Sequence, residues 1–362
     1  MQSVRAKSQN AGAPGELGLL RRIRQRAGAA AGAGLRVGIG DDCALLRPRQ
    51  GEELAVTTDL SIEGRHFRLD WHPAEAIGHR TLARGLSDLA AMGARPVAAF
   101  LSLGLPRELT VASPRGKAWR GKSWIDRFLD GFLALAEAHA TALAGGDLAE
   151  SSVAVFDVVP VGAVARGQAL LRSGARPGDL LYATGSLGGA AAGLARLAEF
   201  ARRANPAKKA GLGRTPSGRQ SNPRIPARLA GALAPHLYPR PRVAQGLWLA
   251  RRGLATAALD LSDGLSTDLS HICEESGVAA EVDAAALPIH PGASLAQALD
   301  GGEDYELLFT AAPAARVPRA IAGVPIARIG RMVRPRKGRP PAVLITERGV
   351  QPLEPRGWEH FS

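Results

Sequence analysis

The sequence has little of several features that mark other classes of protein. Aromatic residues make up 4% of its 362 residues, so the cores are expected to be mainly aliphatic. Two cysteines, Cys43 and Cys273, are too few to staple a chain of this length, and they predict reduced thiols rather than disulfides or a zinc site. The most apolar stretch, 89–105, is broken by Arg95 and Pro96 and is too short to span a bilayer.

A recognisable targeting signal is also lacking at the start of the chain. Residues 1–15 contain no apolar core of the kind found in secretory signals, and we expect a flexible tail there. Together with the absence of a long apolar run, this predicts a cytoplasmic protein with no membrane partner.

Acidic residues are missing from one long segment, which accounts for most of the net charge of +13. Between residues 201 and 259 there is no Asp or Glu, whereas Arg and Lys occupy twelve positions. Residues 200–228 are rich in Gly, Pro, Ser and Asn without hydrophobic periodicity, which predicts a mobile loop, and a shorter basic insertion covers 111–123. Residues 201–228 have none of the aromatic residues that stack on bases, so nucleic acid is not the expected partner.

Apolar periodicity predicts an α+β protein of two α/β domains with mixed sheets flanked by helices. We place an N-terminal domain at 16–164 and a C-terminal domain at 165–362. Helices are expected at 16–30, 73–93, 124–139, 190–203, 242–251 and 266–275. Strands are expected at 37–46, 54–60, 97–103, 142–145, 153–164, 180–184, 255–261, 279–282, 306–309 and 326–332.

Carboxylates recur in short motifs with Gly, Ser or Thr, each following an apolar segment. Converging carboxylates repel one another and raise one another's pKa unless cations neutralise them. Mg²⁺ is bound by such oxygen ligands, commonly together with a polyphosphate. The motifs therefore predict a magnesium- and nucleotide-dependent enzyme; they are Gly40-Asp41-Asp42, Thr57-Thr58-Asp59, Leu86-Ser87-Asp88, Gly145-Gly146-Asp147, Asp260-Leu261-Ser262-Asp263-Gly264 and Gly301-Gly302-Glu303-Asp304.

Taken singly, each motif also has a structural interpretation. The Gly-Asp-Asp motif at 40–42 suits a hairpin turn, and Asp263 could cap the helix that follows it. The glycine-rich segment 185–189 could offer backbone N–H groups to a phosphate or simply turn from strand to helix. Asp88 is expected inside a helix, partly buried, where it needs a cation or a side-chain partner. It is the number of such motifs that favours a shared site.

The ordered set of motifs resembles the thiamine-monophosphate kinase family, within the aminoimidazole ribonucleotide synthetase-like superfold. The resemblance extends over about residues 16–361. The segments that carry it are GIGDDCALL (38–46), TTD (57–59), EGRHF (63–67), LSDLAAMGA (86–94), GGD (145–147), RSGARPGD (172–179), TGSLGGAAAGL (184–194), DLSDGL (260–265), GGEDYELLF (301–309) and the closing GWEHF (357–361).

This resemblance implies a homodimer that pairs through its N-terminal domains. It also implies transfer of the γ-phosphoryl of ATP to thiamine monophosphate, giving thiamine diphosphate. The positions that match magnesium ligands are Asp41, Thr57, Thr58, Asp59, Asp88, Asp147, Asp260 and Asp263, among which Asp59, Asp88, Asp147 and Asp263 are the implied catalytic residues. Those that match ATP contacts are Gly146, Asp147, Arg172 and Ser262, and those that match acceptor contacts are His66, Glu303 and Trp358.

Two other functions remain open on the sequence. One is a different ATP-dependent synthetase of the same superfold, of the selenophosphate or purine-precursor type; the former would need a reactive cysteine before Cys43, and none is present. The other is a non-catalytic nucleotide- or RNA-binding protein that uses the basic loop, whose RNA binding would depend steeply on salt.

Overall fold

The structure is a computed structural model that describes residues 15–28, 34–111, 122–204 and 225–359. Apart from Gly15, the expected N-terminal tail lies outside the described residues, as does the greater part of the two basic insertions. The ends of the longer insertion are helical: α4 (Gly189–Ala204) runs into it and α5 (Ala227–Leu237) begins before its expected end. No helix of the described residues is long and apolar enough to cross a membrane.

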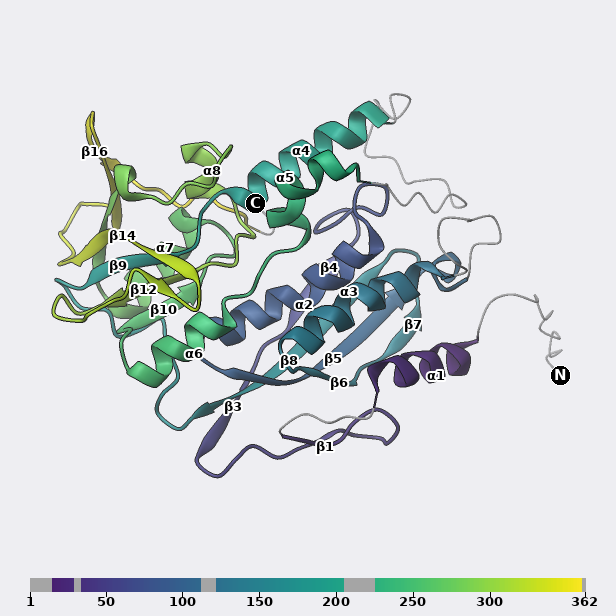
Figure 1. Cartoon of the computed structure of the whole chain (residues 1–362). Helices are drawn as coiled ribbons and strands as arrows, with labels where there is room; N and C mark the ends of the chain where they lie inside the picture. Colours follow the sequence, from purple (N-terminus) through teal and green to yellow (C-terminus); the bar gives the residue numbers. More distant parts are fainter. Residues whose placement is uncertain (1–14, 29–33, 112–121, 205–224, 360–362) are drawn as a thin grey trace, which may run out of the picture.

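The N-terminal half is built on a six-stranded mixed sheet. Its strands pair in the order β3-β8-β5-β6, with β4 also on β8 and β7 also on β5. Helices α2 and α3 pack against each other over one face of this sheet (Figure 1). The bounds are β3 Glu52–Val56, β4 Asp59–Ile62, α2 Ala74–Ala91, β5 Arg95–Leu105, α3 Trp124–Ala138, β6 Ala142–Gly145, β7 Leu148–Glu150 and β8 Val155–Ala165, with a short 3-10 helix at Arg107–Thr110.

The C-terminal half is built on an eight-stranded sheet ordered β10-β12-β9-β14-β11-β15-β16, with β13 beside β14. Helices α4 and α5 lie together above the junction of the halves, and α6 contacts α2 (Figure 1). The bounds are β9 Leu180–Thr184, α6 Val243–Arg252, β10 Ala257–Asp260, α7 Leu265–Ser276, β11 Ala279–Asp283, α8 Leu295–Asp300, β12 Leu307–Ala311, β13 Ala320–Ile321, β14 Val324–Val333, β15 Ala342–Thr346 and β16 Gly349–Pro352, with a 3-10 turn at Ala284–Ala286.

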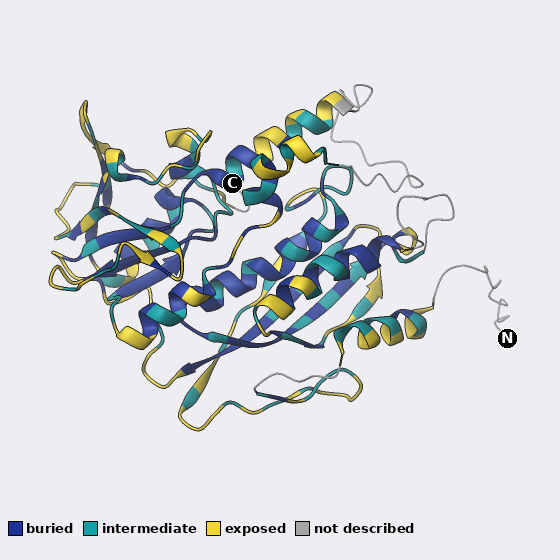
Figure 2. Ribbon diagram, in the orientation of Figure 1, coloured by how far each residue is buried: buried dark blue, intermediate teal, exposed yellow. Residues whose placement is uncertain are grey.

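One hydrophobic core crosses from the first sheet to the second by way of α2. It joins Leu86 and Leu89 of α2 to Tyr182 and Phe309 of the second sheet. Buried residues accordingly fill the inner faces of both halves, whereas the outer faces of α1 and α4 are exposed (Figure 2). Because α2 belongs to both packing surfaces, it fixes how the two sheets meet.

The core between α2, α3 and the six-stranded sheet is more aromatic than the composition of the chain predicts. The Phe156 ring lies 5.3 Å from that of Phe67 and 4.6 Å from that of Phe128, measured between centroids, and Trp124 stacks beside them. A Cβ at Gly78 would come within 1.9 Å of the Phe128 carbonyl oxygen, so glycine lets α2 and α3 approach closely enough to pack this stack.

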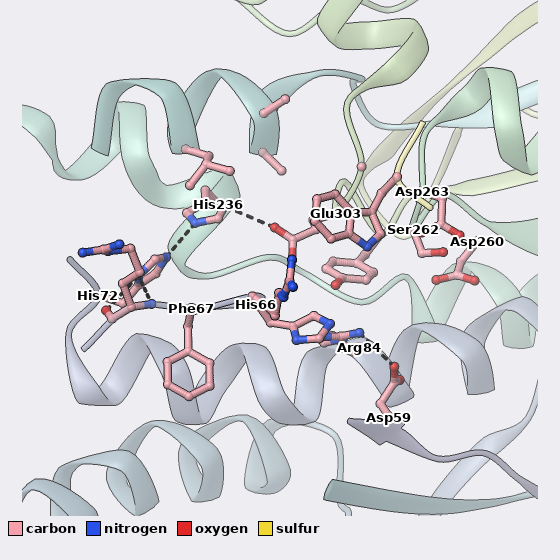
Figure 3. A pocket seen from close by; sticks show the side chains of 18 of the residues that line it. Asp59, His66, Phe67, His72, Arg84, His236, Asp260, Ser262, Asp263 and Glu303 are labelled. Carbon is pink, nitrogen blue, oxygen red and sulfur yellow. Dashed lines mark hydrogen bonds and ion pairs between the residues drawn. The ribbon is translucent and has the colours of Figure 1, made fainter. Parts of the chain in front are cut away.

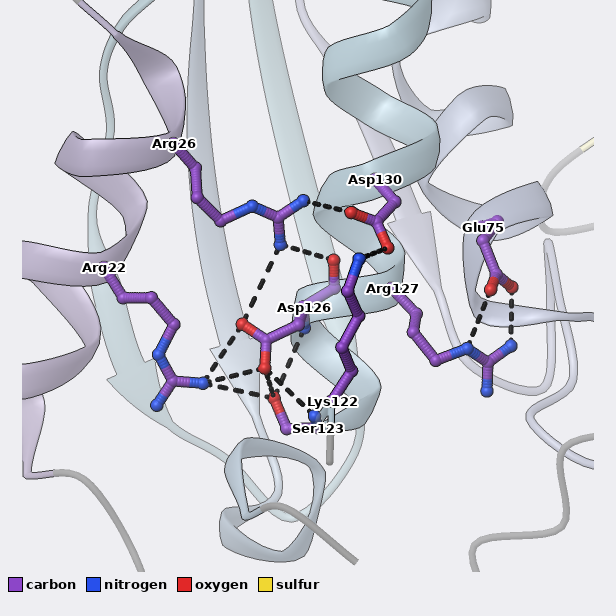
Figure 4. Close-up of polar contacts among 8 residues, drawn as sticks. All are labelled: Arg22, Arg26, Glu75, Lys122, Ser123, Asp126, Arg127 and Asp130. Carbon is purple, nitrogen blue, oxygen red and sulfur yellow. Dashed lines mark hydrogen bonds and ion pairs between the residues drawn. The ribbon is translucent and has the colours of Figure 1, made fainter. Parts of the chain in front are cut away.

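Helix α1 (Glu16–Ala27) is held to α3 by charged side chains (Figure 4). Arg22 donates to Asp126 at 2.9 Å, and Arg26 donates to Asp130 at 2.5 Å. Ser123 and Asp126 form a capping box at the start of α3, which satisfies N–H groups that a helix end leaves without partners.

The predicted elements are present, with differences at their ends and in two segments. The single strand expected at 37–46 is instead two short antiparallel strands, β1 (Leu35–Val37) and β2 (Leu45–Leu46), and the Gly-Asp-Asp motif lies in the loop that joins them. The strand expected at 54–60 is divided into β3 and β4, which pair with successive parts of β8. In the second segment, pairing with β8 is interrupted at residues 57 and 58.

Candidate active site

A cavity of about 480 Å³ opens where the two halves meet. The residues that line it come from β4, the β4–α2 connection, α2, the start of α4, the end of α5, the end of β10 with the loop that follows it, the loop before β12 and the segment after β16. It brings together eight of the fourteen predicted site residues, several of which Figure 3 shows: Asp59, His66, Asp88, Asp260, Ser262, Asp263, Glu303 and Trp358.

At one end of the cavity carboxylates crowd together. Asp59 begins β4, Asp88 lies in α2 and Asp260 ends β10. Burial raises the pKa of Asp59 to about 6 although Arg84 opposes the shift, and Asp88 adds to it. Burial followed by the charge of Asp88 raises the pKa of Asp260 well above its ordinary value. The positive charge of Arg84 therefore compensates these carboxylates only in part.

Hydroxyl groups orient two of these carboxylates. Thr57 Oγ1 donates to Asp88 Oδ2 at 2.5 Å, and Ser87 Oγ donates to Asp260 Oδ2 at 2.6 Å. Burial raises the pKa of Asp88, and the Thr57 hydrogen bond opposes that shift. The hydroxyls hold the carboxylates in place but bring no charge to balance them.

The donor set fits a divalent cation that phosphates help to hold. Within the described residues, no three Asp, Glu, His or Cys side chains are arranged to hold one ion by themselves. Mg²⁺ needs no such cage, since one or two carboxylates with waters and substrate phosphates commonly complete its six ligands. A cation bound here would supply the charge that the buried carboxylates of Asp59 and Asp260, whose pKa values burial raises, need in order to stay ionised.

Two further charged residues belong to this end and were missed from the sequence. Arg84 lines the cavity, and its Nη2 lies 3.3 Å from Asp59 Oδ1. Asp157 of β8 accepts a hydrogen bond from Thr58 Oγ1 at 3.1 Å and raises the pKa of Asp59 further, after the larger effects of burial and Asp88. An Asp between the buried Phe156 and Val158 of one strand was the signal that could have revealed it.

Six of the predicted site residues do not line the cavity. Thr57 and Thr58 lie directly behind it, through their bonds to Asp88 and Asp157. Arg172 is exposed but close enough to lower the pKa of Asp88, against the larger opposing effect of burial. The other three are exposed on loops beside β1, β6 and β7: Asp41, Gly146 and Asp147.

The other end of the cavity includes the loop before β12. A Cβ at Gly302 would come within 2.4 Å of the Ser262 carbonyl oxygen, so glycine is needed where this loop passes Ser262. The Glu303 N–H donates to the same carbonyl at 2.7 Å. Burial favours a raised pKa for Glu303, but the charge of Arg80 and its hydrogen bond outweigh burial and lower it.

The N-terminus of α4 does not present free N–H groups to a phosphate. Asp304 accepts hydrogen bonds from Gly188 N at 2.5 Å and Ala190 N at 3.0 Å, which fills the place that a phosphate would take. The capping expected from Asp263 is also corrected: Asp268 of α7 accepts from the N–H groups of Asp263 and Gly264, both at 3.0 Å.

Two buried histidines that line the cavity, His72 and His236, make folding stability sensitive to pH. Burial, and then the charge of Arg80, lowers the pKa of His72 to about 3. An unfolded His takes up its proton near pH 6.5, so between about pH 3 and 6.5 the unfolded chain binds more protons and the contribution of His72 to stability decreases as the pH falls. We expect the difference in unfolding free energy between wild type and His72→Gln to shrink by about 1–2 kcal/mol from about pH 7.5 to about pH 5. Urea unfolding at both pH values measures this, and a difference independent of pH would contradict a neutral imidazole at His72.

Comparison with known proteins identifies the family. Residues 40–165 match the family model of the N-terminal domain of AIR synthase related proteins, and residues 176–340 match that of their C-terminal domain. The thiamine-monophosphate kinase of Escherichia coli (strain K12) is 36% identical over 340 residues, which covers 91% of this chain and 93% of that protein. The chain belongs to the thiamine-monophosphate kinase family.

Solved structures of this family have the same fold. The thiamine-monophosphate kinase of Stenotrophomonas maltophilia K279a superimposes with a TM-score of 0.70 at 38% identity, covering 90% of this chain and 95% of that one. AaThiL, complexed with AMPPCP and TMP, superimposes with a TM-score of 0.67 at 27% identity and covers 99% of this chain and 100% of its own. The fold expected from the motifs is thereby confirmed, and membership of this family argues against a synthetase of another branch of the superfold.

Proposed function

We propose that this protein transfers the γ-phosphoryl of ATP to thiamine monophosphate, giving thiamine diphosphate and ADP, the final step of thiamine diphosphate biosynthesis. The observation that carries the proposal is one cavity with a carboxylate-rich end and an end lined by aromatic and apolar groups. The neighbour AaThiL, which carries AMPPCP and TMP, supports the same pair of substrates.

The carboxylate-rich end would hold the reacting phosphates. Asp59, Asp88, Asp260 and Asp263 would bind Mg²⁺, which supplies charge neutralisation between two anionic substrates and aligns their phosphates. Ser262 would contact the ATP. The proposal also retains the six residues outside the cavity in the roles that the family resemblance implies, namely Asp41, Thr57, Thr58 and Asp147 for magnesium, and Gly146, Asp147 and Arg172 for ATP.

The other end would hold the thiamine moiety. Trp358, which is 51% exposed, offers a flat face to an aromatic cation, and Leu194 of α4 adds apolar surface. His66 and Glu303 supply polar groups close to them. This combination suits a molecule with both a heteroaromatic ring and a positive charge.

The protein's own residues mainly orient and neutralise the reactants. The second ionisation of a phosphate monoester has a pKa near 6, so the attacking oxygen is already ionised near neutral pH and no general base is needed. Arg84, whose guanidinium faces the cavity beside Asp59, would offset charge on the transferring group. Positioning of the two phosphates then supplies most of the acceleration.

A panel of acceptors tests the proposal. Purified protein is incubated with ATP, Mg²⁺ and, in turn, thiamine monophosphate, free thiamine or no acceptor, and the thiamine compounds are separated by chromatography. We expect thiamine diphosphate from the monophosphate alone and only when metal is present. ATP hydrolysis without formation of thiamine diphosphate would contradict thiamine monophosphate as the acceptor. Absence of any nucleotide turnover would favour a binding protein instead.

We also propose that the enzyme is a cytoplasmic homodimer that pairs through its N-terminal half, with 16–164 as the magnesium-binding, ATP-binding and dimerisation domain and 165–362 as the second domain. In support, β3 and β4 lie at an edge of the six-stranded sheet and expose large apolar side chains, with Val56 at 62%, Leu60 at 46% and Leu54 at 43%. A second copy that covered these side chains would remove this surface from water.

Val56→Glu tests this surface. A carboxylate buried without a partner costs several kcal/mol, so we expect the dimer dissociation constant to rise about tenfold or more. Val350→Glu, at a residue 64% exposed on β16, is the matched control and should leave assembly unchanged. Sedimentation at several protein concentrations measures both, and equal dissociation constants would place the contact elsewhere.

A further inference from the structure

Arg80 of α2 is a buried cation at the wall of the cavity, with 5% of its surface exposed. Its Nη2 donates to Glu303 Oε1 at 2.6 Å and lies 3.4 Å from the His66 carbonyl oxygen. Its Nη1 donates to the His236 carbonyl oxygen at 2.5 Å and to His236 Nδ1 at 3.0 Å. One guanidinium thus connects the β4–α2 connection, the end of α5 and the loop before β12.

Two histidines that line the cavity extend this connection (Figure 3). His236 Nε2 lies 3.0 Å from His72 Nε2, and His72 Nδ1 lies 3.1 Å from the Arg68 carbonyl oxygen. With both rings neutral, one of the two Nε2 atoms donates to the other, and His72 Nδ1 bonds to the Arg68 backbone, whose N–H nitrogen and carbonyl oxygen each lie 3.1 Å away. Because a guanidinium has only donors and both rings are neutral, Arg80 keeps its positive charge. That charge faces Glu303.

Glu303 needs such a partner because its backbone is held in an unfavourable conformation. Its φ is +68° and that of Tyr305 is +51°, a region that residues with side chains adopt at a cost. Its carboxylate is 27% exposed, with Oε1 bound to Arg80 and Oε2 lying 3.5 Å from His236. Among the described residues, Arg80 is the arginine or lysine within hydrogen-bond distance of the Glu303 carboxylate. Loss of Arg80 would therefore leave this carboxylate, and the strained loop that carries it, without that contact.

We propose that Arg80 is a positioning residue for the acceptor: it fixes the Glu303 carboxylate in the orientation that receives the thiamine end of the substrate. This role rests on the function proposed above. The guanidinium does not line the main cavity, so it acts through Glu303 and through the segments that it joins. Loss of the role should weaken acceptor binding and leave ATP binding almost unchanged.

Arg80→Met is the test, with Arg127→Met as its matched control. Arg127 of α3 is likewise 5% exposed, and it pairs with Glu75 of α2 at 2.7 and 2.5 Å (Figure 4). Neither residue of this pair lines the cavity. We expect Arg80→Met to raise the KM for thiamine monophosphate about tenfold or more while the KM for ATP changes less than about twofold. Arg127→Met should lower Tm without changing either KM, since a purely structural loss has no preference for one substrate.

Milder variants keep the test informative if Arg80→Met does not fold. Arg80→Lys retains the charge but not the fork that serves two partners, so we expect an intermediate KM for thiamine monophosphate. In a double variant with Glu303→Gln, Arg80→Lys should add no further loss, because both changes disrupt the same contact between Arg80 and Glu303. If the two changes multiplied in their effect on the KM for thiamine monophosphate, or if an active Arg80 variant kept the wild-type KM, the positioning role would be overturned. The proposed function would then still stand. A wild-type protein that forms no thiamine diphosphate would overturn the proposed function and this role with it.

Discussion

Asp88→Asn is expected to lower kcat at least about a hundredfold while the protein stays folded. The side chain lies in α2 between Asp59 and Asp260, where the amide that replaces it cannot neutralise a cation. Removing one of the crowded charges also relieves repulsion, so Tm without Mg²⁺ should be equal to or higher than that of wild type. Steady-state kinetics over a range of Mg²⁺ concentrations, together with thermal unfolding, measure both effects.

Asp179→Asn is the matched control for this variant. Asp179 is 4% exposed and remote from the cavity, and it accepts hydrogen bonds from Thr256 Oγ1 at 2.7 Å and from Arg176 N at 2.9 Å. The control should therefore lose stability and retain kcat, the opposite of Asp88→Asn. Near-normal turnover of Asp88→Asn would remove that carboxylate from the metal site.

Arg242→Met is expected to lower the free energy of unfolding by about 3–5 kcal/mol. Arg242 directly precedes α6, and its Nε and Nη2 each lie 2.5 Å from an oxygen of Glu306. Glu306 is 3% exposed and otherwise accepts one hydrogen bond, from Thr184 Oγ1 at 2.6 Å. Methionine would leave a buried carboxylate without its cation.

Arg331→Met separates this effect from the loss of any arginine. Arg331 pairs with Glu281 at 2.7 Å, but its side chain is 63% exposed, and such pairs contribute about 1 kcal/mol or less. Urea unfolding of the two variants and wild type measures the difference. If both variants lost the same stability, burial of the Arg242–Glu306 pair would not account for the larger loss expected of Arg242→Met.

Local patterns were sufficient to predict most of the elements that form the walls of the site, with α5 as an exception. In α2 the residues at helical spacing, Ile77, Leu82, Leu86 and Leu89, are all at most 1% exposed. The acidic motifs were expected to converge because separate turns would not require so many carboxylates after apolar segments. The structure brings Asp59, Asp88, Asp260 and Asp263 to one cavity; the magnesium ligation of these residues remains a prediction.

The remaining features depend on contacts between segments far apart in the chain. Arg80 and His236 are separated by 156 residues, and neither lies in a motif that would single it out. Pro235 inside α5 and the basic composition around it obscured that helix. The division between β3 and β4 is also nonlocal, because Thr57 N donates to the Pro160 carbonyl of β8 just where the two strands separate.

Transfer of a labelled phosphoryl group tests the central claim most directly. Enzyme in excess over ATP labelled in its γ-phosphoryl is mixed with Mg²⁺ and thiamine monophosphate, and the labelled products are separated after a single turnover. We predict that the label appears in the terminal phosphate of thiamine diphosphate in proportion to the ADP formed. Label released as inorganic phosphate, or ADP formed without labelled diphosphate, would contradict direct transfer between two substrates held in this cavity.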